Sequence, residues 1–103
     1  MSFTIQFTQE KEVLRVSPAG DLDINSSPEL KISVLDEYQK EPKNLVFDLE
    51  KLEYLDSTGL GAFISIFKNL KEENHSITIV NAKPNIRKLF TITELDRIFR
   101  LED

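Results

Sequence analysis

The N-terminal segment FTIQFT, residues 3–8, alternates apolar and polar side chains. A period of two residues is typical of a half-buried strand. Residues 12–19 alternate again after the turn residues 9–11, and Gly20 ends this second run. The two segments therefore predict a β-hairpin.

Helical spacing follows in three later segments, where apolar side chains recur every three or four residues. The first helix is expected to begin at Ser27, a good N-cap, with Pro28 at the first helical position, and to end near Pro42. The strongest pattern covers about residues 57–73, and a short third helix opens at Pro84. The apolar side chains of these segments and of the strand before the second helix are expected to fill the core: Phe47, Leu60, Phe63, Ile64, Phe67 and Phe90.

Compact apolar runs at residues 44–48 and 77–80 predict buried strands, and a last strand is expected near residues 98–99. The charged segment between residues 49 and 55 is interpreted as a turn. The predicted order is therefore β-β-α-β-α-β-α-β, an α/β fold. We expect a parallel-rich mixed sheet with helices packed mainly on one face, in a single domain over residues 1–103.

Three segments should then meet beyond the carboxyl ends of the strands, where functional groups of such sheets collect. They are residues 20–23, 48–56 and 81–84.

Composition narrows the function classes. The 103 residues contain 13 basic and 18 acidic side chains, a net charge of −5, which disfavours nucleic-acid binding. The absence of cysteine excludes disulfides, thiolate zinc sites and cysteine nucleophiles. No apolar run approaches the roughly 20 residues of a membrane span, and the N-terminus lacks the features of a secretory signal. We therefore expect a cytoplasmic protein with no membrane partner.

The most specific segment is LDSTGLGAF, residues 55–63, which holds two of the three glycines of the chain. Glycine inside a helix costs up to about 1 kcal/mol relative to alanine, so these positions need a reason. One interpretation is close packing of the helix on the sheet. The other is close approach by a partner. A phosphate on Ser57 would meet free backbone N–H groups at the helix start, and would face Asp56.

These segments resemble the anti-sigma factor antagonists, small bacterial proteins built as a STAS domain. The resemblance runs through GDLDINSSPEL at residues 20–30, NLVFDLEKLEYLDSTGLGAF at 44–63 and ITIVNAKPNIRKLFTITELDRIF at 77–99. The Asp-Ser-Thr-Gly-Leu-Gly stretch is the most specific mark of the family. Its phosphorylated serine matches Ser57, and Asp23 matches an acidic position beside that site.

The resemblance implies a partner-switching protein that catalyses nothing and needs no cofactor or metal. The unphosphorylated form is expected to bind an anti-sigma factor that is also a serine kinase, and so to free the sigma factor. Phosphorylation of Ser57 ends binding and a serine phosphatase resets the protein, which the family habit makes a monomer or weak dimer. The residues expected to bind the partner are Asp21, Asp23, Asp56, Ser57, Thr58, Gly59, Leu60 and Gly61.

Three alternatives remain beside this interpretation. The chain could be a STAS scaffold or transport-complex subunit that does not switch, and nucleotide binding stays open. A receiver-like phosphoacceptor domain would use Asp21 and Asp23, an acceptor Asp48, and Lys83 before a proline. A serine hydrolase is implausible, because His75 is the only histidine and lies about 18 residues of helix, some ~27 Å, from Ser57. No P-loop motif is present.

Overall fold

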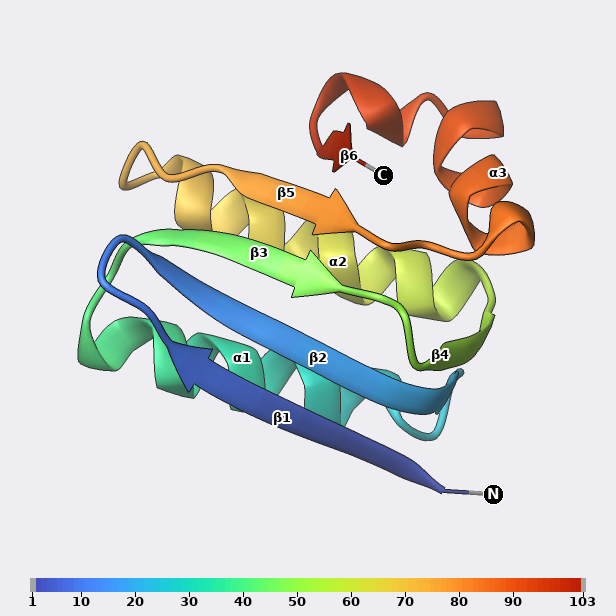
Figure 1. The fold of residues 1–103 in the computed structure, drawn as a ribbon, viewed down its shortest axis with the longest axis horizontal. Coiled ribbons are helices and arrows are strands. Elements are labelled where there is room, and N and C mark those ends of the chain that lie inside the picture. The colour runs from blue at the N-terminus through green and yellow to red at the C-terminus, as the bar shows by residue number, and fades with distance from the viewer. Residues whose placement is uncertain (1, 103) are drawn as a thin grey trace.

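The computed structural model describes residues 2–102, which form one mixed sheet and three α-helices (Figure 1). The strand order is β1-β2-β3-β5-β6, and β4 pairs with the distal part of β2. The elements are β1 (Phe3–Gln9), β2 (Val13–Leu22), α1 (Ser27–Lys40), β3 (Asn44–Asp48), β4 (Leu52–Leu55), α2 (Ser57–Lys71), β5 (Ile77–Val80), α3 (Pro84–Ile92), a short 3₁₀ turn (Leu95–Arg97) and β6 (Arg100–Glu102). The predicted α/β fold with a mixed sheet is confirmed.

The predicted hairpin is formed by β1 and β2, which are antiparallel, while the other strand pairs are parallel. The expectation that Gly20 ends the second strand is wrong, since β2 continues to Leu22. Gly20 has φ +100°, and a Cβ there would lie 2.1 Å from the carbonyl oxygen of Ser2. The glycine therefore allows the strand to pass close beside the start of β1.

The interpretation of residues 49–55 as a turn is confirmed only for residues 50 and 51, because Leu52–Leu55 form β4. Leu52 and Leu55 are buried and the two residues between them are exposed. β4 runs parallel to the end of β2, with Leu22 opposite Leu55 and a register shift between Gly20 and Asp21. β2 thus pairs with β3 along its first half and with β4 along its second, and the two ends that lead into α1 and α2 lie together.

Helices α1 and α2 pack side by side on one face of the sheet, behind it in Figure 1. The helix predicted over residues 57–73 is α2, which ends at Lys71. Phe63 of α2 lies at the centre of the core, with its ring 4.8 Å from that of Phe47 and 5.7 Å from that of Phe90. Edge-to-face aromatic pairs of this kind stabilise a core beyond the area that they bury.

The last strand, expected near residues 98–99, is present directly after them. It is β6, Arg100–Glu102. Phe99 is buried and its ring packs against those of Phe67 and Phe90, so it anchors the chain in the core just before the strand, whereas Ile98 is exposed. Of the side chains expected in the core, Ile64 and Phe67 are half-buried, and Phe67 packs against the core.

Candidate functional site

Asp56 sets the start of α2. Its backbone is extended, and its Oδ1 accepts hydrogen bonds from the N–H groups of Thr58 at 3.0 Å and Gly59 at 3.1 Å. The Thr58 hydroxyl also donates to Oδ1, at 2.6 Å. These hydrogen bonds, that of the hydroxyl first, lower the pKa of Asp56. The carboxylate is therefore an N-cap, and the helix begins at Ser57.

Ser57 and Thr58 differ although both are exposed. The Thr58 hydroxyl is bonded to Asp56, whereas that of Ser57 has no hydrogen-bond partner among residues 2–102. The expectation that a phosphate on Ser57 would meet free N–H groups needs correction. Those of Thr58 and Gly59 are bonded to the Asp56 carboxylate and that of Leu60 to the Asp56 carbonyl. A phosphate at Ser57 would thus lie beside an ionised carboxylate and not in a prepared anion site.

The two glycines of α2 serve different purposes. A Cβ on Gly59 would lie 2.5 Å from Leu55 Cδ1 and 3.0 Å from the Leu22 carbonyl oxygen, so Gly59 is required for packing against β4 and β2. A Cβ on Gly61 would meet nothing within 4 Å. Leu60, which lies between them, is 7% exposed and belongs to the core, so little of it is available to a partner. Packing explains Gly59, whereas no contact with another part of residues 2–102 explains Gly61.

The three aspartates expected at the site are brought together. Asp21, Asp23 and Asp56 line one hollow of about 470 Å³ with Tyr54, because β2 and β4 pair at their carboxyl ends. Tyr54 is 49% exposed. It was missed in the sequence because its segment was interpreted as a turn. An acidic hollow of this kind repels a phosphate and attracts a basic side chain.

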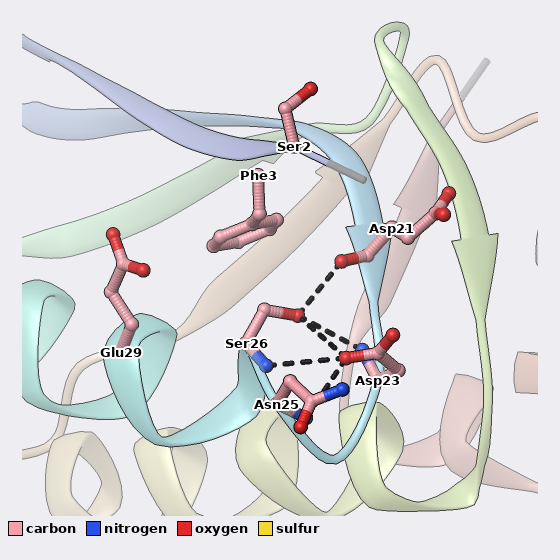
Figure 2. A pocket seen from close by; sticks show the side chains of 7 residues that line it. All are labelled: Ser2, Phe3, Asp21, Asp23, Asn25, Ser26 and Glu29. Carbon is pink, nitrogen blue, oxygen red and sulfur yellow. Dashed lines mark hydrogen bonds between the residues drawn. The ribbon is translucent and has the colours of Figure 1, made fainter.

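Asp23 also organises the turn before α1 (Figure 2). Its Oδ1 accepts from the N–H groups of Asn25 at 2.9 Å and Ser26 at 3.2 Å. The hydroxyl of Ser26 donates to the carbonyl oxygen of Asp21 at 2.7 Å, and that of Ser27 to the carbonyl oxygen of Asp23 at 2.6 Å. The helix starts at Ser27 with Ser26 as N-cap, one residue before the predicted cap. Oδ1 of Asp23 is therefore used to order the loop between β2 and α1, and only Oδ2 is left to contact a partner.

A shallow apolar groove runs between the N-terminal parts of α1 and α2 and is lined on both helices beyond their first turns. Ile24 stands at this groove and is 70% exposed, the largest exposure among the large apolar side chains of residues 2–102. Sequence reasoning did not single it out, since it lies in a polar loop. The groove is lined by Ile24, Ser27, Pro28, Lys31, Thr58, Gly61, Ala62 and Ser65.

The receiver-like arrangement does not form. Asp48 lines a different hollow from Asp21 and Asp23, and its Oδ1 accepts from the side-chain amide of Asn81 at 3.1 Å. Lys83 donates to the carbonyl oxygen of Glu50. Residues 2–102 contain no group of three side chains placed to hold a metal ion.

His75 is not near Ser57, because it follows the opposite end of α2. Its Nδ1 is hydrogen-bonded to the hydroxyl of Tyr38, the buried tyrosine near the end of α1. Burial first, and the charge of Glu73 second, raise the pKa of Tyr38 to about 12. The hydroxyl is thus available for this hydrogen bond, which links the C-terminal end of α1 to the segment that follows α2.

None of the helices within residues 2–102 has the length and apolar character needed to span a bilayer.

Comparison with known proteins places these features in context. The model of the STAS domain family matches residues 4–103. An anti-sigma-B factor antagonist of Staphylococcus aureus is 29% identical over 103 residues, which cover 100% of this chain and 95% of the relative. The Bacillus subtilis anti-sigma-B factor antagonist is 31% identical over 98 residues, covering 95% and 89%. The crystal structure of an anti-sigma factor antagonist from Mycobacterium paratuberculosis has a TM-score of 0.86 at 29% identity, covering 97% and 85%.

Proposed function

Because the chain belongs to the STAS domain family, we propose that it is an anti-sigma factor antagonist whose activity is switched at Ser57. The unphosphorylated protein binds an anti-sigma factor that is also a serine kinase, and the sigma factor is released. Phosphorylation of Ser57 ends this binding, and a serine phosphatase restores it. The chain itself is a substrate and a binding module, and it acts in the cytoplasm.

The observation that carries the proposal is the state of the Ser57 hydroxyl. It is exposed at the start of α2 and has no partner among residues 2–102, so a kinase can reach it without breaking a hydrogen bond. Transfer of the γ-phosphoryl group of ATP to Thr58 would instead break its bond to the helix-capping Asp56. The geometry thus favours Ser57 over its neighbour as the acceptor.

The charge of the phosphate accounts for the loss of binding free energy on phosphorylation. A phosphate adds about −1.5 to −2 charges next to Asp56, on a surface that already carries Asp21 and Asp23. An unpaired charge forced into a partner interface costs about 2–5 kcal/mol. That cost corresponds to a loss of about 30-fold to several thousand-fold in affinity, enough to separate a bound from a free antagonist.

The test has two parts. The chain is incubated with ATP and a lysate of its own host and then digested with trypsin, and the peptide of residues 52–68 should carry an acid-stable phosphate on Ser57. A Ser57→Ala variant should carry none, while Thr58→Ala, the matched control, should still be phosphorylated at Ser57. Acid-labile phosphate on Asp48 would make the chain receiver-like, and no phosphate in an active lysate would favour a scaffold or transport-complex subunit.

Binding is measured by calorimetry with the purified anti-sigma factor of the same host. Ser57→Ala should bind it as tightly as the wild type, and Ser57→Asp should bind it at least about tenfold more weakly. Equal affinities of Ser57→Ala and Ser57→Asp would contradict the proposal that a negative charge at Ser57 ends binding.

A further inference from the structure

Strand β1 forms one edge of the sheet and, within residues 2–102, pairs with β2 alone (Figure 1). In an antiparallel pair every second residue directs its N–H and C=O groups away from the partner strand. β1 therefore presents a row of unpaired backbone donors and acceptors along its outer side. Such a row is a template for one more strand.

This edge lacks the devices by which proteins usually block further pairing, which are charged side chains, proline and short length. β1 is seven residues long, and residues 2–9 include neither a charged side chain nor a proline. The opposite edge, β6, is three residues long and carries Arg100 and Glu102. The two edges of the same sheet thus differ in how open they are to a new strand.

The helix-covered side of β1 is also incompletely buried. Phe3, Ile5 and Phe7 are half-buried. Val16, which lies opposite Phe7 on β2, is 0% exposed. The difference arises because β1 has a neighbouring strand on one side only. A second strand beside β1 would cover apolar surface that the single chain leaves open to water.

The sequence of β1 is self-complementary in antiparallel pairing. With Ile5 opposite its own copy, Phe3 lies opposite Phe7 and Thr4 opposite Gln6. The apolar side chains of β1 then share the helix-covered face and its polar ones share the other, and the paired strands bring no charged side chains of their own together. A two-fold axis generates such an interface from one surface patch.

We infer that the β1 edge is the surface through which two copies of this chain associate, by antiparallel β1–β1 pairing into one continuous sheet. The association does not depend on Ser57, so it holds or fails separately from the proposed switch. Each copy carries a net charge of −5. Since added salt screens this repulsion, the dimer should tighten with ionic strength.

The wild-type chain is examined by sedimentation velocity up to about 1 mM protein, in buffers of low salt and of about 0.5 M salt. A concentration-dependent shift from monomer to dimer, stronger at high salt, is expected. A monomer under all these conditions would overturn the inference.

Charge-pattern variants test the surface itself, using the exposed Thr4 and Gln6. The double variant T4K/Q6K places like charges opposite each other and should raise the dimer dissociation constant at least about tenfold, although it lowers the net charge that repels the copies. T4E/Q6E should also be monomeric, and an equimolar mixture of the two should form the heterodimer. Failure of the mixture to associate would contradict β1–β1 pairing.

The matched control is T4K/Q6E, which keeps the wild-type net charge. In the register centred on Ile5 it places the introduced lysine of one copy opposite the introduced glutamate of the other, so it should dimerise at least as well as the wild type. Its dissociation into monomers would refute that register. Thermal melting by circular dichroism confirms that each variant is folded before its association state is compared.

Discussion

A substitution at Gly61 should change the stability of the protein and its affinity for a partner in opposite directions. Gly61 lies in the second turn of α2, it is exposed, and a Cβ at this position meets nothing within 4 Å. A Gly61→Ala change therefore adds a methyl group without a clash. Alanine loses less backbone freedom than glycine on forming a helix, by about 0.5–1 kcal/mol.

For a domain of this size, 1 kcal/mol shifts the melting temperature by about 4–8 °C, so Gly61→Ala should raise it by about 2–8 °C. Gly59→Ala is the contrasting variant. Its Cβ would lie 3.0 Å from the backbone oxygen of Leu22, which cannot move aside as a side chain can. Overpacking of about 1–3 kcal/mol exceeds the gain in helix propensity, and Gly59→Ala should melt lower than the wild type.

The same methyl group should weaken partner binding, because it fills space in the groove that Gly61 shares with Ile24. We expect Gly61→Ala to melt higher and yet to bind the anti-sigma factor at least about tenfold more weakly by calorimetry. Gln39→Ala, an exposed change near the other end of α1, is the control and should leave affinity unaltered. A stabilised variant with wild-type affinity would refute the idea that Gly61 is kept for a partner, and a destabilised one would refute the packing argument.

Three further changes test the fold. Asp56→Ala removes the cap of α2 and should cost about 1 kcal/mol in urea unfolding. Because folding lowers the pKa of Asp56, its contribution is present above its ordinary pKa of 3.8 and is lost as the pH falls through the lowered value, so the wild-type and alanine unfolding curves should converge in acid. Tyr38→Phe leaves Nδ1 of His75 without its hydrogen-bond partner and should cost about 0.5–1.5 kcal/mol by the same assay. Phe63→Ala leaves a cavity at the centre of the aromatic core and should lower the free energy of unfolding by about 3–5 kcal/mol, which thermal melting would show as a large drop in melting temperature.

Local pattern was sufficient for the elements that have a regular period. The alternation in residues 3–8 and the helical spacing after Ser57 predicted β1 and α2 because each buries one face on a single core. β4 was not predicted from the sequence, because its four residues are flanked by charged side chains. Its partner strand, β2, also lies more than 25 residues earlier in the chain. A strand that short is defined by its partner and not by its own composition.

The candidate site was predictable to the extent that chain order fixes it. Parallel strands bring the ends of β2 and β4 together, so Asp21 and Asp56 share a hollow, although β4 itself was unforeseen. The sequence did not show that the carboxylates of Asp23 and Asp56 accept hydrogen bonds from the backbone N–H groups that follow them, since capping depends on side-chain rotamers. The separate roles of Gly59 and Gly61 required the positions of Leu22 and Leu55.

The position of Tyr54 makes its intrinsic fluorescence a probe of events at the candidate site. The sequence has no tryptophan and two tyrosines, so near-ultraviolet fluorescence comes from two rings in unlike surroundings. Tyr38 is shielded from solvent and bonded to His75, whereas Tyr54 is open to water beside Asp56. An event at the hollow alters the solvent and charge around Tyr54 and leaves Tyr38 as an internal reference. Phosphoryl transfer or partner docking next to Ser57 can therefore be followed in real time without attaching a dye.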